Sequence, residues 1–237
     1  MKLTGTIRDV STLSAREQMT MFSLMRSHYT NVKREKFLTD LAEKDGVLLL
    51  SSGTGVIQGF TTFMLMEFAF RNQPVYTLYS GDTIVDRSCW GQMELFRCFG
   101  ALFRKFIQDQ KEPLYWFLLT KGIKTYLLLP LFFKRFYPNC RTETPLETRE
   151  LMESLAYRKF GEFYHKEQGI VRVVPRADSL QEQFASIPEH KRKNPHVRHF
   201  TAHNPGYTEG DELVCLARIS ASNFTPKAQR FVKLKQQ

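Results

Sequence analysis

One segment of the chain, residues 75–129, carries the pattern that most limits the possible folds. A strand-like apolar run is interrupted at Ser80-Gly81, and a loop containing Trp90-Gly91 precedes a helix. A glycine inside a strand favours a bulge or a close backbone approach. A glycine between a strand and a helix favours a loop whose exposed amides can meet an anionic ligand. A second apolar strand and another helix follow, so the segment predicts a bulged strand beside a second strand.

The rest of the chain reads as an alternation of strands and helices. The expected strands are 4–9, 46–51, 56–70, 75–85, 114–119 and a late strand over 210–219. The expected helices are one from Ser14 that breaks at 28–31, then 33–43, 92–107, 121–129 and one that starts at 144–147. Ser14 and Glu17 form a capping-box pattern, and Glu147 is the expected capping partner of the last helix. Pro130 is expected to end the helix that starts at Lys121.

Length and composition allow a buried core in one large domain or two small ones. The chain has 237 residues, of which 42% are hydrophobic, and no Pro, Ser or Gln tract dominates. The composition changes near 139–148. We therefore expect a core domain over 1–140 and a basic C-terminal part over 141–237 that packs on the core as one unit.

Positive charge is concentrated towards the C-terminal end. The net charge is +10, and residues 186–237 hold nine Lys or Arg and four Asp or Glu, with the densest run at 190–193. Such a segment is either a solvated surface or a contact for phosphates in a nucleotide cofactor, a lipid, an acidic carrier protein or a nucleic acid. No helix-turn-helix, zinc-finger or RNP pattern is present, so nucleic acid is the weakest of these choices.

Aromatic residues are numerous, with 20 Phe and nine Tyr. They either fill the core or line a cavity for an apolar ligand. The N-terminal residues lack a signal-peptide pattern, and the longest apolar runs, 60–66 and 126–133, are too short for a membrane span of ~20 residues. The four cysteines have no CxxC spacing, so neither a disulfide framework nor a metal site is expected. We expect a cytoplasmic protein.

The order of elements over residues 4–137 resembles the GNAT superfamily of N-acyltransferases. The similarity lies in a long hairpin, a bulged strand after it and a glycine-bearing loop ahead of the next helix. It implies an α+β fold in which a mixed, mostly antiparallel sheet with a bulged central strand is flanked by helices, plus an irregular helical C-terminal extension. It also implies acyl transfer to an amine, with a coenzyme A (CoA) thioester as co-substrate and no bound cofactor.

The loop between the bulged strand and the helix departs from the family pattern. In the family this loop reads Arg/Gln-x-x-Gly-x-Gly/Ala, and its amides hold the pyrophosphate of CoA. Only Gly91 matches this pattern. Trp90 occupies a position where the family usually has an arginine, and Met93 and Leu95 occupy positions where it usually has small residues. Because of this departure, an acyl carrier protein is an alternative to CoA as the carrier of the acyl group. The residues that the resemblance places at the donor are Ile84, Val85, Trp90, Gly91, Gln92 and Thr120.

Acylation of an amine needs a base for the nucleophile and an acid for the leaving thiolate. Glu67 lies in an aromatic strand, where desolvation would suit a base, although the solvent end of that strand is the other possible position. Asp82, after the bulge, is a second candidate base. Tyr126 lies near the position where the family places the tyrosine that protonates the thiolate.

The residues expected to shape the substrate site are His28, Tyr29, Phe63 and Tyr79. The abundance of apolar residues favours a medium- or long-chain fatty acyl donor, since each buried methylene contributes ~0.8 kcal/mol. The acceptor would be the amine of a peptide, an amino acid or a small metabolite. The alternative is a non-catalytic GNAT-like binding module that docks an acidic partner.

Overall fold

The computed structural model of the protein describes residues 2–109, 112–174 and 178–233. The strands are β1 (Leu3–Asp9), β2 (Tyr29–Thr30), β3 (Gly46–Ser52), β4 (Ile57–Phe70), β5 (Gln73–Val85), β6 (Leu114–Thr120), β7 (Tyr164–His165), β8 (Ile170–Val171), β9 (Ser179–Leu180) and β10 (Glu212–Arg218). The α-helices are α1 (Ala15–His28), α2 (Arg34–Ala42), α3 (Glu94–Gln108), α4 (Ile123–Tyr126), α5 (Leu128–Phe132), α6 (Leu146–Phe160), α7 (Glu182–Ala185), α8 (Glu189–Arg192), α9 (Pro195–His203) and α10 (Pro226–Val232). Five single-turn 3-10 helices join them: η1 (Val10–Thr12), η2 (Arg87–Cys89), η3 (Gly161–Phe163), η4 (Tyr207–Glu209) and η5 (Ala221–Asn223).

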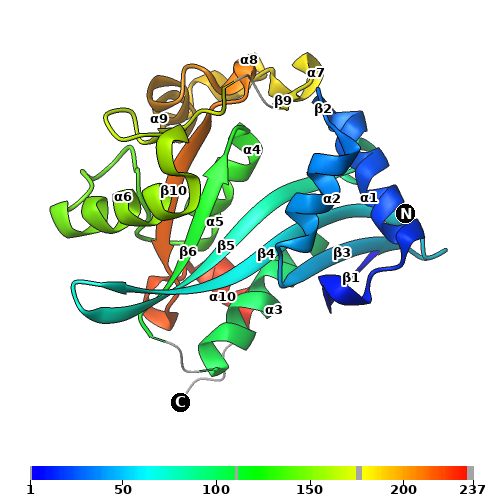
Figure 1. The fold of residues 1–237 in the computed structure, drawn as a ribbon, viewed down its shortest axis with the longest axis horizontal. Helices are drawn as coiled ribbons and strands as arrows, with labels where there is room; N and C mark the ends of the chain where they lie inside the picture. Colours follow the sequence, from blue (N-terminus) through cyan, green and yellow to red (C-terminus); the bar gives the residue numbers. More distant parts are fainter. Residues whose placement is uncertain (1, 110–111, 175–177, 234–237) are drawn as a thin grey trace.

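One large sheet runs through the molecule in the order β1-β3-β4-β5-β6-β10-β8-β7 (Figure 1). Only β5 and β6 pair in parallel, and the other neighbouring strands are antiparallel. Strands β2 and β9 form a separate two-stranded ribbon. The predicted mixed, mostly antiparallel sheet is confirmed, and β10 extends it with residues from the C-terminal part of the chain.

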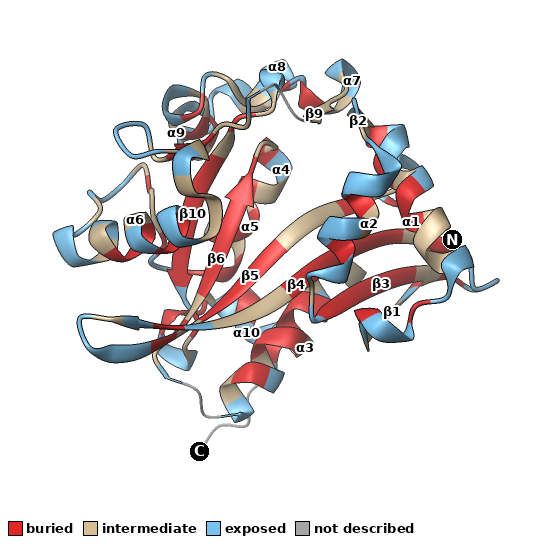
Figure 2. Cartoon of the chain, viewed as in Figure 1, coloured by how far each residue is buried: buried red, intermediate tan, exposed pale blue. Residues whose placement is uncertain are grey.

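Helices cover both faces of the sheet. On one face, α1 and α2 pack on β3, β4 and the end of β5, with Phe60 and Ile84 in a shared buried cluster. On the same face, α6 packs on β5, β6 and β10. On the other face, α3, α5 and α10 enclose the largest cluster. Burial follows these layers, because the middle strands are buried along most of their length and the helices expose their outer sides (Figure 2).

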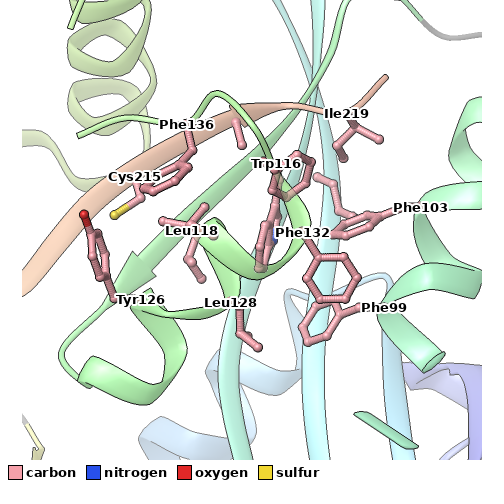
Figure 3. Close-up of a cluster of buried hydrophobic side chains, with 14 of the residues drawn as sticks. Phe99, Phe103, Trp116, Leu118, Tyr126, Leu128, Phe132, Phe136, Cys215 and Ile219 are labelled. Carbon is pink, nitrogen blue, oxygen red and sulfur yellow. The ribbon is translucent and has the colours of Figure 1, made fainter. Parts of the chain in front are cut away.

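The largest cluster is dense with aromatic rings (Figure 3). The ring of Phe103 lies 5.4 Å from that of Trp116 and 5.4 Å from that of Phe132. Phe99 contacts both Trp116 and Phe132, and none of these side chains is exposed. Aromatic pairs at such distances stabilise a core beyond the effect of the buried area alone. These rings therefore fill the core, which is the first of the two interpretations of the aromatic composition.

The N-termini of α1 and α6 show how far the local sequence predicts side-chain capping. The capping box at Ser14 is confirmed, since its hydroxyl accepts from the Glu17 amide and the Glu17 carboxylate accepts from the Ser14 amide. The expected role of Glu147 is wrong: α6 has no side-chain cap, and Glu147 pairs with Arg71 at 3.4 Å. The N-cap residue is Pro145, which has no backbone N–H from which the carboxylate could accept.

The sequence predicted that Pro130 would end a helix, and this prediction is wrong. Instead the helical segment divides at Leu127, and Pro130 lies in the first turn of α5. Amides of the first turn have no partner within the helix, so a proline costs little at that position. Among the described residues, none of the helices is long and apolar enough to cross a membrane.

Candidate functional site

The parallel strands β5 and β6 separate in the middle of the sheet. They pair from Tyr76–Leu114 to Ser80–Leu118, and beyond Ser80 strand β5 stays with β4 while β6 stays with β10. The indole N–H of Trp116 donates to the Ser80 hydroxyl at 2.9 Å, inside the core. This bond joins the two strands at the last point where they are neighbours. A gap therefore opens between the ends of β5 and β6.

The separation begins at a bulge in β5. Thr61 lies opposite Thr83 and Phe63 lies opposite Ser80, so Gly81 and Asp82 together face the single residue Thr62. A Cβ atom on Gly81 would lie 2.6 Å from the Thr62 hydroxyl, which is closer than real contacts allow. A larger residue here would displace the Thr62 or Lys44 side chain, and the extra residue bends the strand away from β6.

The bulge also sets which main-chain groups face the gap. The Asp86 amide donates to the Gln58 carbonyl, and hydrogen-bonded positions alternate along an antiparallel pair. Thr83 and Val85 therefore occupy non-hydrogen-bonded positions of the β4–β5 pair, and their N–H and C=O groups point away from β4. The Val85 carbonyl accepts from the His28 imidazole at 3.1 Å and from the Trp90 indole at 2.9 Å.

A cavity of about 390 Å³ occupies the open end of the gap. Its walls come from the end of β5, the loop before α3, the start of α4 and the segment that carries β9, α7 and α8. The apolar lining consists of Leu3, Leu50, Ile84, Val85, Cys89, Leu95, Phe96, Ile123, Leu128, Leu180 and Phe184. Tyr29 and Leu180 are directly paired in the β2–β9 ribbon, which joins the two sides of the cavity.

Three cations lie around the opening of this cavity. Lys124 and Lys191 line it, and Arg87 belongs to the adjoining loop. The Lys124 ammonium lies 2.9 Å from the centre of the Trp90 ring, and the Arg87 guanidinium lies 5.9 Å from it. Partial burial, with the charges of Lys191 and Arg87, lowers the pKa of Lys124 to about 8. No carboxylate pairs with these three cations within the described ranges, so an anion would be stabilised here.

The loop before α3 is anchored to the edge of the sheet. Gly91 has a φ angle of +87°, which favours glycine, and no atom lies within 4 Å of where its Cβ would be. The Gln92 and Glu94 side chains accept from the β1 amides of Leu3 and Gly5, each at 3.1 Å. The loop is thus held in place by β1.

A second group of charges lies beside the bulge, on the face covered by α1 and α2. The Lys121 ammonium lies 2.8 Å from Asp178 and 3.7 Å from Glu212, and its side chain is only 11% exposed. It also lies 5.5 Å from the ring of Tyr29, a residue that lines the cavity. Burial, and then the charge of Asp178, raise the pKa of Asp82 to about 6. A carboxyl group with this pKa is suited to accept a proton near neutral pH.

Most of the predicted site residues meet at this cavity. Its lining includes His28, Tyr29, Ile84, Val85, Trp90, Gly91 and Gln92. Asp82 lies on the same strand, next to the residues that line it. Thr120 lies just beyond the lining, where its hydroxyl donates to the Gly122 carbonyl. Phe63 and Tyr79 are buried against Phe106 and Phe117 and do not line the cavity.

Two predicted catalytic residues lie elsewhere. The expected desolvation of Glu67 is wrong, because Glu67 is exposed on the β4–β5 hairpin that projects from the sheet (Figure 1). Strand β3 ends opposite Phe63, so β4 has no strand partner on that side at Glu67. Tyr126 is fully buried, packs against Phe136 and Phe200, and donates to the Pro138 carbonyl at 3.0 Å. Its contacts are those of a core residue.

Several lining residues were missed by sequence reasoning. Leu180, Phe184 and Lys191 come from the turn-rich part of the chain, and Lys124 comes from a helix of four residues. Elements this short have no periodic pattern. The basic run 190–193, for which the sequence allows either a solvated surface or a contact for phosphates, contains Lys191.

Neither a protein-family model nor a curated protein sequence matches the chain. Solved structures are similar to parts of it. A probable N-acyltransferase of Enterococcus faecalis V583 is 11% identical, with a TM-score of 0.44 over 56% of this chain and 33% of that one. A GNAT family N-acetyltransferase of Escherichia coli, in complex with CoA, is 13% identical, with a TM-score of 0.38 over 51% and 65%. A chain of the NatC complex bound to Gag peptide and CoA is 11% identical, with a TM-score of 0.42 over 93% and 100%.

The chain thus spans about a third of the length of the Enterococcus protein. Each of these TM-scores is below 0.5, so the fold assignment depends on the sheet itself. The GNAT resemblance implied a mixed, mostly antiparallel sheet with a bulged central strand, and the observed sheet has these features. The fold is GNAT-like.

Proposed function

We propose that this protein is an N-acyltransferase that binds a CoA thioester in the cavity and transfers its acyl group to an amine. The observation that carries the proposal is the apolar cavity in the gap between β5 and β6, with Lys124, Lys191 and Arg87 around its opening. A thioester of CoA combines an extended, largely uncharged arm with phosphates at one end. The arm fits the gap, and the phosphates fit the three cations.

The chemistry follows from the position of Asp82 beside the gap. The amine nitrogen attacks the thioester carbonyl, a C–N bond forms, and the electron pair of the broken C–S bond leaves on sulfur as a thiolate. Asp82 takes the proton that the nitrogen loses. A main-chain amide of Thr83 or Val85 donates to the carbonyl oxygen while it carries negative charge, as in other oxyanion sites. A thiol has an ordinary pKa of about 8.5, so the thiolate leaves without a dedicated acid.

The length of the acyl chain stays a prediction from the sequence. The phenylalanines of α3 that suggested a fatty chain are mostly in the core, and only Phe96 lines the cavity. The remaining lining is still apolar enough to favour methylenes over water. An acyl carrier protein stays a possible donor, since its acidic surface would also meet the three cations.

The test is release of free thiol from acetyl-, octanoyl- and palmitoyl-CoA in the presence of amines. The panel of acceptors comprises amino acids, simple alkylamines and short peptides. Asp82→Asn serves as the inactive control and is expected to reduce the rate about a hundredfold. Calorimetry with CoA measures binding separately from turnover. Absence of both thiol release and CoA binding would refute the proposal.

A non-catalytic binding module is the second candidate. The specific observation in its favour is that the Val85 carbonyl, which faces the gap, is already occupied by His28 and Trp90. A ligand arm would then have one acceptor fewer along this strand. CoA binding without thiol release from any donor would favour this second function.

A further inference from the structure

We propose that the amine acceptor carries a carboxylate, and that Lys44, Thr62 and Asp82 form its binding site beside the bulge. The inference rests on the proposed function, because it concerns the second substrate of the same reaction. The site lies on the face of the sheet covered by α1 and α2, where Thr62 and Asp82 are two residues from Phe60 and Ile84 of the buried cluster and share their face.

The Thr62 hydroxyl is a buried polar group that lacks a partner. Its oxygen makes no hydrogen bond, although the residue is only 3% exposed. It lies directly beside Gly81, 2.6 Å from where a Cβ atom would be. An unsatisfied buried hydroxyl costs ~1–3 kcal/mol, so a ligand that bonds to it recovers this free energy. A ligand that reaches this hydroxyl must displace the Lys44 side chain, whose Cε lies 3.2 Å from the same Cβ position.

Lys44 supplies a positive charge without a carboxylate partner. Its ammonium donates to the Asp40 carbonyl at 2.9 Å, and no ion pair to it is found among the described residues. Its side chain crosses the bulge, with Cε 3.2 Å from the same Cβ position on Gly81. Burial, and then the charge of Lys159, lower the pKa of Lys44. A bound anion would raise the pKa of Lys44 again and so stabilise its charged form.

Opposite charges therefore flank the bulge at a short separation. Asp82 would bind the amine of an acceptor, and Lys44 would bind a carboxylate of the same small molecule. Lys159, whose ammonium lies 5.8 Å from the Tyr79 ring, adds a second positive charge on the Lys44 side, although it is paired with Glu43 at 3.1 Å. A diamine would bring a cation towards these lysines and be repelled. Lys44, Gly81 and Asp82 are each partly exposed, so a small acceptor reaches them from solvent.

The test compares amino acids with the amines that lack their carboxylate, such as phenylalanine with 2-phenylethylamine. Thiol release is measured with the donor that the wild-type protein uses best. We expect kcat/KM to be at least tenfold higher for the amino acid. In Lys44→Met, which keeps an apolar stem over the bulge, the ratio of the two values is expected to fall about tenfold. The matched control is Lys33→Met, an exposed lysine at the start of α2.

Two outcomes would overturn this inference while leaving the proposed function intact. One is a wild-type protein that acylates plain amines as well as amino acids, and the other is an unchanged ratio in Lys44→Met. Binding of the N-acyl amino acid product, measured by calorimetry, gives a readout that does not need turnover. We expect Lys44→Met to weaken this binding about tenfold, and a product that does not bind the wild-type protein contradicts the inference.

Discussion

The ammonium of Lys124 lies 2.9 Å from the centre of the Trp90 indole ring, at the opening of the cavity. Trp90 stands where a GNAT loop usually has an arginine, and its exposed ring offers Lys124 a cation–π contact. The indole N–H is fixed at the same time by the Val85 carbonyl. A positive charge from α4 therefore lies over the loop at position 90.

Lys124→Met is expected to weaken CoA binding roughly tenfold, because a charge-assisted contact to phosphate is lost. Calorimetry at low salt measures the change. The affinity of the wild-type protein should also fall as the pH rises through about 8, where Lys124 loses its proton. Lys227→Met, an exposed lysine of α10, is the control. Equal affinities for both variants would exclude Lys124 from the phosphate site.

Asp82 should make stability depend on pH with a defined sign. Its pKa is raised to about 6 in the folded protein, so the folded chain holds this proton more tightly than the unfolded chain does. The contribution to stability is full below pH ~4 and is lost as the pH rises to about 6. Asp82→Asn is expected to raise Tm at pH 7.5 more than at pH 4.5. A Tm difference that is the same at both pH values would argue against a raised pKa.

Lys121 should be essential for stability. Its side chain is 11% exposed and neutralises Asp178 and Glu212, which are 16% and 27% exposed. Lys121→Met leaves two largely buried carboxylates without their cation, and we expect the free energy of unfolding to fall by ~3 kcal/mol. Urea unfolding measures the change. The double variant Lys121→Met with Glu212→Gln should recover part of the loss, and a double variant less stable than the single one would contradict this explanation.

The bond between Trp116 and Ser80 should stabilise the point where β5 and β6 part. Ser80→Ala removes the acceptor of a buried indole N–H, which is expected to cost ~1–3 kcal/mol of unfolding free energy. Ser154→Ala on the exposed side of α6 is the matched control. Thermal and urea unfolding of both variants provide the comparison. Similar stability of the two would show that the indole finds another partner.

Cys140 should be the cysteine that reacts first with alkylating reagents. It is partly exposed, and its sulfur lies 3.2 Å from Nδ1 of His196. Cys89, Cys98 and Cys215 are buried, and burial raises the pKa of Cys98 to about 12. Mass spectrometry after brief exposure to iodoacetamide at pH 7.5 identifies the labelled site. His196→Ala should change the rate of labelling, because it removes the ring that contacts the sulfur.

The sequence was most informative where a single residue decides the local geometry. Ser14 and Glu17 start α1, and the interruption at Ser80-Gly81 marks the bulge, where a larger residue would crowd the Thr62 side chain. Glu67 could not be placed in the same way. Its exposure depends on where β3 ends, which is decided by pairing between distant segments.

The second wall of the cavity could not be predicted for a similar reason. Phe184 and Lys191 belong to helices of four residues, for which propensity and periodicity carry little information. Their positions depend on long-range contacts, such as the bond from the Gln181 amide to the His28 carbonyl at 2.9 Å. Such contacts leave no local trace in the sequence.

The arrangement around Lys121 also constrains the order of events during synthesis. Lys121 is made long before Asp178 and Glu212, and the last of these follows about 90 residues later. At a translation rate of ~5–20 residues per second, the lysine waits for roughly 5–20 seconds before both carboxylates exist. Until then Lys121 lacks both of the carboxylates with which it pairs in the folded protein, and Asp82 is a nearby carboxylate that has already been made. We therefore expect this region of the nascent chain to stay hydrated until β10 emerges.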